Sequence, residues 1–386
     1  MAKYIAIADS TVKAIKESDY KNLLKQFGNL ISEGNKIAIL NGEKSEYEEK
    51  YSDSFEFPSE KEFLDNIDGI EEPIVFISGR DDIFELSRHR KALFVCPMWL
   101  ENIGENAEKY GVKVSTPKQA YQIIKHSNNN NFWHTRKELN DGTMVFTLLD
   151  AKFRYFSTSA NEGKMIDNFK KTIYGNEKTT FFDVLKYAMI SALSNNHEYF
   201  DDVDIWTVFP SSSLELDENL MEFKKAIEVI TETEAESYIE KEDFKDNLIL
   251  RHTEKEKAHE VPLSVRTSNG SLVNLQTICL NPDFKGKVEG KTVCVIDDFL
   301  NHGYSFEAAR NILKAAGAKQ IILLALGFYQ NDYAYQEFEI KGDPFIPEFE
   351  IGEVKNTETI LNPMFKINPQ AKVEIETLFS VFNSSW

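Results

Sequence analysis

The sequence predicts an α/β fold, with two doubly wound parallel-sheet units in series and a small β-containing extension at the C-terminal end. Short apolar runs of strand length alternate along the chain with longer amphipathic segments of helical spacing. The apolar runs are continuous, which is typical of parallel strands that helices cover on both faces. The chain has 386 residues, too many for one ordinary domain, so two or three domains are expected.

Composition and charge narrow the class of protein. With 42% hydrophobic and 28% charged residues, the chain can build globular cores. The net charge of −19 argues against a nucleic acid or an anionic membrane as partner, because phosphates attract a basic surface. The apolar runs are too short for a signal peptide or a membrane span, so we expect a cytoplasmic protein. Three widely spaced cysteines are expected to be buried free thiols: Cys96, Cys279 and Cys294.

Residues 1–126 are expected to form the first unit. Strand-like and helix-like segments alternate there, which predicts a parallel sheet with both faces covered. The expected strands are Tyr4–Ala8, Lys36–Leu40, Pro73–Ile77, Ala92–Val95 and Val112–Val114, and the expected helices are Tyr20–Ser32, a segment ending at His89, and Pro117–Lys125.

Polar residues follow three strands of this first unit. This arrangement resembles the haloacid dehalogenase-like (HAD) phosphatases, in which an aspartate nucleophile follows the first strand and a second aspartate lies two residues later. Asp9 matches the nucleophile, Thr11 stands at the second aspartate, Asn41 follows the second strand, and Asp82 matches one magnesium-binding acid. The acid/base aspartate is missing, so the resemblance implies a degenerate domain. P-type ATPases use an Asp-x-Thr arrangement, which keeps phosphoryl transfer at Asp9 as an alternative.

Residues 127–146, which begin with a polar asparagine-rich run, are expected to be a linker or boundary. A second unit is expected over residues 147–335. Residues 336–386 have short strand-like runs and turn signals, which favour a hood or a segment that forms a homodimer. The second unit should contain the strands Thr143–Leu149, Asp204–Pro210, Leu248–Arg251 and Val273–Leu280, the helices Lys164–Tyr174 and Phe181–Ser194, and an acidic helical stretch over 214–246.

The stretch Lys291–Gly317 organises this second unit. Val293–Ile296 is a continuous apolar run, and Asp297 and Asp298 stand where that strand should end. A polar loop follows, with Asn301, His302, Gly303, Tyr304 and Ser305. A helix should begin near Phe306, and Ile321–Leu326 should be the next strand. A loop at this edge of a βαβ unit is where open α/β sheets bind ligands.

The chemistry of this stretch suits a phosphorylated sugar. Backbone N–H groups at a helix start bind phosphate, and Gly303 allows the loop to approach it closely. Asp297 and Asp298 can accept hydrogen bonds from vicinal hydroxyl groups. Upstream, the run Ser211, Ser212 and Ser213 after a strand can turn backbone N–H groups toward an anion.

The run from Val293 to Ser305 resembles the phosphoribosyl pyrophosphate (PRPP) motif of type I phosphoribosyltransferases. The resemblance implies that Asp297 and Asp298 bind the ribose hydroxyls, and that the loop after them grips the 5-phosphate. It also implies Mg²⁺, held mainly by the ligand and only indirectly by the two acids. The family usually has small hydroxyl residues where Asn301 and His302 stand.

The same resemblance covers residues 190–330 more loosely. It implies that Ser211, Ser212 and Ser213 form a pyrophosphate-binding loop. It places Arg251, as a catalytic cation, together with Lys255 and Lys257 toward pyrophosphate. Surface exposure without a function is an equally good interpretation of each of these three cations. His252, His259 and His302 are possible proton-transfer groups.

Three hypotheses remain open. The first is a phosphoribosyltransferase that binds PRPP with Mg²⁺ and transfers phosphoribose to a base-like acceptor, releasing pyrophosphate. The second is a non-catalytic PRPP or nucleotide sensor, in which the HAD-like unit is a scaffold for a partner; separately, a HAD-type phosphatase that acts on a phosphorylated small molecule stays an alternative. The third is the reverse direction, in which water or pyrophosphate releases a base from a nucleotide. The sequence contains no code for the acceptor.

Overall fold

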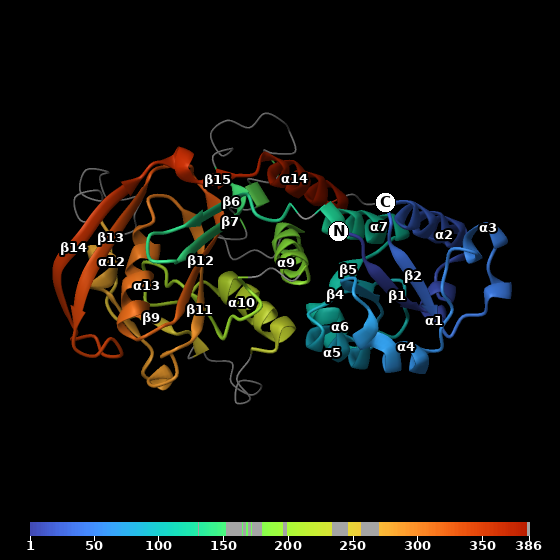
Figure 1. Cartoon of the computed structure of the whole chain (residues 1–386), viewed down its shortest axis with the longest axis horizontal. Coiled ribbons are helices and arrows are strands. Elements are labelled where there is room, and N and C mark those ends of the chain that lie inside the picture. Colours follow the sequence, from blue (N-terminus) through green and yellow to red (C-terminus); the bar gives the residue numbers. More distant parts are fainter. Residues whose placement is uncertain are drawn as a thin grey trace.

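The computed structural model describes residues 1–129, 131–151, 164, 167–168, 171, 180–195, 199–233, 246–255 and 270–383. The fold is mixed α/β, with a five-stranded parallel sheet, a six-stranded mixed sheet and two separate two-stranded sheets. The five-stranded sheet, called the first sheet, and the six-stranded sheet, called the second sheet, lie at opposite ends of an elongated molecule (Figure 1). No helix among the described residues reaches the length and apolar character needed to cross a bilayer.

The first sheet has the strand order β2-β1-β3-β4-β5, and every neighbouring pair is parallel. Its strands are β1 (Tyr4–Ala8), β2 (Lys36–Leu40), β3 (Ile74–Ile77), β4 (Leu93–Pro97) and β5 (Val112–Val114). A parallel bridge from Ala38 to Glu56 adds a short contact on the outer side of β2. All five expected strands are present, within one or two residues of their predicted bounds.

Helices cover both faces of the first sheet. One face packs on α2 and α7, and the other packs on side chains of α4, α5 and α6. The short helices among them were not predicted from the sequence. The helices are α1 (Asp9–Lys13), α2 (Glu17–Ser32), α3 (Glu49–Ser52), α4 (Glu60–Asn66), α5 (Asp81–His89), α6 (Glu105–Tyr110) and α7 (Pro117–Asn129).

The second sheet has the order β15-β6-β7-β12-β11-β8. Its four strands β7, β12, β11 and β8 are parallel, whereas at one edge β6 pairs antiparallel with β7 and β15 pairs antiparallel with β6. The expectation of a wholly parallel second sheet is therefore wrong, because a tight turn containing Gly142 (φ +83°) returns the chain from β6 to β7. The strands are β6 (Thr135–Glu138), β7 (Met144–Asp150), β8 (Ile205–Val208), β11 (Thr292–Leu300), β12 (Gln320–Phe328) and β15 (Lys366–Ile367).

The segment 127–146, expected as a linker, contains the end of α7 and the strands β6 and the start of β7. Asparagines at its start continue the helix instead of ending it. Of the expected helix over 164–174 and the acidic stretch over 214–246, large parts lie outside the described residues. Among the described residues, α10 (Glu218–Thr231) lies inside the acidic stretch, and α9 (Thr180–Leu193) coincides within one residue with the expected helix Phe181–Ser194.

One expected strand is partly wrong. Residues Val273–Leu280 begin in helix α12 (Leu272–Leu275), and only β10 (Ile278–Leu280) is a strand, paired antiparallel with β9 (Ile249–Arg251). The Thr277 hydroxyl lies 3.0 Å from the carbonyls of Val273 and Asn274, which satisfies the end of this short helix.

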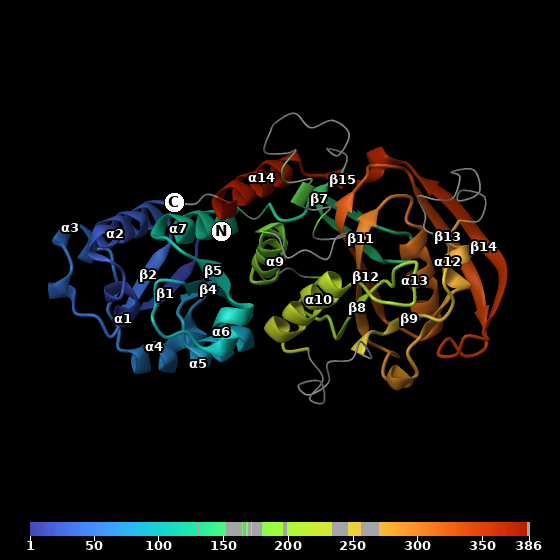
Figure 2. The same ribbon diagram turned by 180° about the vertical axis from the view of Figure 1, so that it is seen from behind.

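The C-terminal segment forms a hairpin and a helix. Strands β13 (Tyr333–Lys341) and β14 (Glu350–Ile360) pair with each other, and β13 packs on α13 (Tyr304–Ala315). Helix α14 (Pro369–Asn383), which the sequence did not predict, then crosses from the second sheet toward the first and packs on α9 and α7 (Figures 1 and 2).

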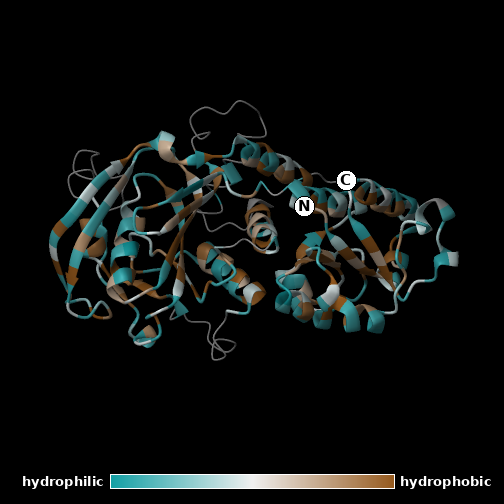
Figure 3. Cartoon of the chain, in the orientation of Figure 1, coloured by the Kyte–Doolittle hydropathy of each residue, from teal (hydrophilic) through white to brown (hydrophobic). Residues whose placement is uncertain are grey.

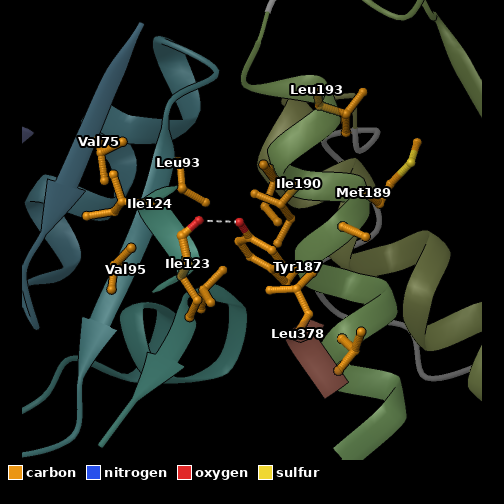
Figure 4. Close-up of a cluster of buried hydrophobic side chains, with 14 of the residues drawn as sticks. Val75, Leu93, Val95, Ile123, Ile124, Tyr187, Met189, Ile190, Leu193 and Leu378 are labelled. Atoms are coloured by element: carbon orange, nitrogen blue, oxygen red, sulfur yellow. Dashed lines mark hydrogen bonds between the residues drawn. The ribbon is translucent and has the colours of Figure 1, made fainter. Parts of the chain in front are cut away.

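A single hydrophobic core joins the two sheets. It runs from the α2–α7 face of the first sheet through α9 and α14 to one face of the second sheet. The strands of both sheets and much of α9 carry hydrophobic colours in Figure 3. Figure 4 shows Ile123 of α7 facing Tyr187 of α9, with the Tyr187 hydroxyl donating to the Ile123 carbonyl, while Ile124 lies beside Val75 and Val95 of the first sheet. The units are therefore not joined by a flexible linker at this interface.

Candidate functional site

The acid pair, Asp297 and Asp298, lies within β11, two residues before the strand ends at Leu300. Each carboxylate accepts the next backbone amide: Asp297 Oδ1 from Asp298 N at 2.9 Å, and Asp298 Oδ1 from Phe299 N at 2.6 Å. Burial, and next the charge of Asp298, raises the pKa of Asp297. Burial also raises the pKa of Asp298. Two carboxyl groups held this way favour cations or hydroxyl donors as partners.

The glycine loop, Asn301–Ser305, follows β11 and leads directly into α13. Gly303 is the N-cap residue and has φ +79°, a conformation that glycine adopts without strain. A Cβ atom at this position would lie 2.3 Å from the Tyr333 ring, so the loop backbone is in close contact with that side chain. The predicted Tyr304 and Ser305 form the first turn of α13, where backbone amides have no intrahelical acceptor and the helix dipole favours anions.

Residues just before β13 and at its start hold the glycine loop in place. The Ala334 amide donates to the His302 carbonyl at 2.9 Å. His302 Nδ1 lies 3.1 Å from the Asp332 carbonyl, so Nδ1 must carry the proton in that bond. Asn331 donates to the Asn301 side chain. Asn301 and His302, which differ from the small hydroxyl residues of the motif that this stretch resembles, thus have structural partners.

The serine loop, Ser211–Ser213, follows β8 and is also ordered by hydrogen bonds. The Ser211 hydroxyl lies 2.9 Å from both the Ser213 hydroxyl and the Glu215 carbonyl. The Lys255 amide donates to the Ser212 carbonyl at 3.0 Å. The serine side chains are exposed or half-buried, so they remain accessible to a ligand.

Arg251 at the end of β9 is buried behind the serine loop. Its guanidinium donates to the carbonyls of Ser211 and Pro210 and to the Thr277 hydroxyl. It also lies 5.9 Å from the centre of the Phe209 ring. Burial lowers the pKa of Arg251 to about 10, while the charge of Asp297 acts the other way. These contacts hold the serine loop and aim the guanidinium at protein acceptors.

Lys255 lies next to the serine loop, to which its backbone amide is bonded. Its ammonium donates to the Asn274 side chain. Burial, and next the charge of Arg251, lowers the pKa of Lys255 to about 8, against the charges of Asp297 and Asp298. Lys255 therefore lies within the electrostatic field of the acid pair. The predicted Lys257 lies outside the described residues.

The structure thus brings the acid pair, the glycine loop, the serine loop and two cations together at the carboxyl edge of β8 and β11. Within the described ranges there is no cluster of three or more histidine, cysteine, aspartate or glutamate side chains able to hold a metal ion. The two carboxylates of Asp297 and Asp298 are oxygen donors of the kind that Mg²⁺ prefers, but they are too few for a complete site. They fit a supporting role, in which the phosphates of a bound ligand and water would hold the ion and the two acids would reach it through that ligand.

The four HAD-like candidates lie at the carboxyl edge of the first sheet. Asp9 begins α1, and its carboxylate accepts the Tyr47 hydroxyl at 2.5 Å and pairs with Lys13 at 2.7 Å. Thr11 is buried in α1. Both oxygens of Asp9 are thus engaged by protein groups.

Asn41 and Asp82 have other roles at the same edge. Asn41 has φ +61°, and its side-chain oxygen accepts the Glu60 amide at 2.9 Å at the start of α4. Asp82 is exposed and paired with Arg80, whose hydrogen bond lowers the pKa of Asp82. These contacts belong to capping and surface pairing, and they do not point the two side chains at Asp9.

Sequence reasoning missed the groups that support the site. Asn274 and Thr277 bond the two cations, and both lie in the segment expected to be a strand. Glu307 and Arg310 form a fully buried ion pair in α13 at 2.6 Å. Their spacing of three in a helix with apolar neighbours is a signal that could have identified them.

Comparisons of the chain with protein-family models, with curated proteins and with solved structures found no match. The function is therefore inferred from the residues of the site.

Proposed function

We propose that the C-terminal unit binds PRPP, or another ribose 5-phosphate, together with Mg²⁺, and transfers phosphoribose between pyrophosphate and a base-like acceptor. The observation that supports this most is the gathering of the acid pair, the glycine loop and the serine loop at one edge of the second sheet. A ribose carrying phosphates at both ends has hydroxyls for the acids and an anion for each loop.

The residues would have distinct roles. Asp297 and Asp298 accept the ribose hydroxyls, and the first-turn amides of α13 bind the 5-phosphate. The serine hydroxyls and the Lys255 ammonium bind pyrophosphate and stabilise its charge as it leaves C1. Mg²⁺, when bound, supplies further positive charge to the phosphates. Arg251 holds the serine loop through its carbonyls rather than contacting the ligand.

A non-catalytic sensor is the second candidate, and one observation favours it. Asn301 and His302 are hydrogen-bonded to residues just before β13 and at its start, which fixes the glycine loop for binding without supplying a group for chemistry. The engaged carboxylate of Asp9 likewise favours a structural first unit over a HAD-type phosphatase.

Calorimetry with PRPP and Mg²⁺, followed by an assay of pyrophosphate release against a panel of bases, tests the proposal. The wild-type protein should bind PRPP, and the double variant Asp297→Asn with Asp298→Asn should lose at least tenfold in affinity. Asp283→Asn, which changes an exposed carboxylate on the same unit, is the matched control. Binding without turnover identifies the sensor, and absence of binding by the wild type refutes both candidates.

A further inference from the structure

Helix α12 and the residues just after it contact both cations of the site. Asn274 accepts the Lys255 ammonium through its side-chain oxygen, and Thr277 accepts a guanidinium N–H of Arg251 through its hydroxyl. The Thr277 hydroxyl proton is directed to the carbonyl of Val273 or Asn274, each 3.0 Å away. Its lone pairs are therefore left for Arg251, and the orientation of that hydroxyl is fixed.

The start of α12 is fixed in turn by Gln336 of β13. The Gln336 side-chain oxygen accepts both the amide and the hydroxyl of Ser271, each at 2.8 Å. Gly270 has φ +54°, and a Cβ there would lie 2.5 Å from the same oxygen. Only a glycine lets Gln336 reach the helix start.

The backbone of Gln336 is bonded to α13, which starts at the glycine loop. Its amide donates to Glu307 at 2.8 Å, and its carbonyl accepts from Arg310 and Asn311, both at 2.8 Å. A continuous hydrogen-bonded path therefore runs from α13 through β13 and α12 to the two cations. The glycine loop and the serine loop are thus both linked by hydrogen bonds to one strand, β13. Figure 2 shows β13 beside α12 and α13.

We infer that Asn274 and Thr277 are positioning residues for the pyrophosphate side of the site, and that Gln336 sets their place from β13. This inference rests on the proposed function. A lysine has a long flexible stem, and fixing its ammonium before the ligand arrives reduces the entropy lost on binding. The Arg251 guanidinium donates hydrogen bonds to the carbonyls of Pro210 and Ser211. A misplaced Arg251 would therefore displace the serine hydroxyls as well.

The positioning residues should affect the binding of the two ends of the ligand differently. Loss of either positioning contact should weaken the binding of pyrophosphate and leave the 5-phosphate end unchanged. A residue with only a structural role would weaken the binding of both, because the whole edge of the sheet would loosen.

The test uses the full chain and the variants Thr277→Val and Asn274→Leu, which keep shape and remove the hydrogen-bonding group. Thr292→Val, a buried threonine at the opposite end of β11, is the control. Calorimetry with magnesium pyrophosphate and, separately, with ribose 5-phosphate gives the affinities, and thermal melting shows that each variant is folded.

We expect each variant to raise the Kd of magnesium pyrophosphate about tenfold and to leave that of ribose 5-phosphate within about twofold. Thr292→Val should change neither affinity. Equal losses for both ligands, or no loss for pyrophosphate, would overturn the inference while the proposed function stands. If the wild-type protein binds neither ligand, the proposed function fails and the inference fails with it.

Discussion

At the scale of single residues, the acid pair is held in a state that costs stability. Asp297 is buried in β11 beside Asp298, and together burial and that neighbouring charge raise its pKa. Between the unfolded value, about 3.9, and the higher folded value, the folded chain binds more protons than the unfolded chain. Stability is therefore lost as pH rises through that window. A site built to bind a cation or hydroxyl donors carries this cost while it is empty.

Asp297→Asn removes the cost, so it should stabilise the protein at pH 7 by about 1–2 kcal/mol although it weakens ligand binding. The gain should shrink as pH falls toward 4, where the wild-type carboxyl becomes protonated in the folded state. Urea unfolding at pH 4, 5.5 and 7 measures this, with Asp283→Asn as the exposed control. A variant less stable than wild type at pH 7, or a gain independent of pH, would show that the acid pair is not electrostatically strained.

Some residues of the candidate site can be recognised from their neighbours in the sequence, whereas others depend on partners far away in the chain. Asp297, Asp298 and Gly303 could be proposed from the sequence because the strand, the two acids and the loop are adjacent in it. Arg251 could also be proposed, but the acceptors of its guanidinium could not, because Pro210, Ser211 and Thr277 lie in two other segments. A single sequence does not reveal such long-range pairing.

At the scale of elements, strands were predicted better than short helices. The buried strands are continuous apolar runs, so the first-sheet strands and β12 lie close to their expected places. The sequence predicts a strand at α12 because leucine and valine residues occur in both helices and strands. Its helical form depends on Ser271 bonding to Gln336 and on Thr277 capping its end. Tertiary contacts of this kind override local preference.

The glycine loop offers a test at the same scale. Gly303 and Gly290 have nearly the same φ, +79° and +75°, but a Cβ at Gly303 would meet the Tyr333 ring, while a Cβ at Gly290 would meet nothing within 4 Å. Gly290→Ala should therefore cost only the backbone strain, about 1–2 kcal/mol. Gly303→Ala adds overpacking, roughly 1–3 kcal/mol more, and displaces the loop from Tyr333.

Chemical denaturation measures the difference in stability, and calorimetry with ribose 5-phosphate measures the effect on the site. We expect Gly303→Ala to raise the Kd of ribose 5-phosphate at least tenfold and Gly290→Ala to leave it unchanged. Equal behaviour of the two variants would show that close packing on Tyr333 does not shape the loop.

At the scale of the whole molecule, the sequence indicated two units but not how they join. The expected linker supplies strands to the second sheet, and the unpredicted helix α14 returns to pack on α7 and α9. The amphipathic pattern of α9 does not reveal that Tyr187 would bond to Ile123 of the other unit. Further contacts cross the same boundary: Arg88 donates to the Val229 carbonyl, and Lys91 to the Asp201 carbonyl at 2.6 Å.

The shared core predicts that the two sheets unfold together. Heat should produce one transition whose calorimetric and van't Hoff enthalpies agree, despite a length at which separate domains are usual. Phe84→Leu sharpens the test, because Phe84 packs on the far face of the first sheet, in a separate cluster from the shared core. A loss of about 1–2 kcal/mol there should lower hydrogen-exchange protection in β11 and β12 as much as in β1 and β3. If only the first sheet loses protection, the units are independent, and the core at α7, α9 and α14 is an interface that opens before either sheet unfolds.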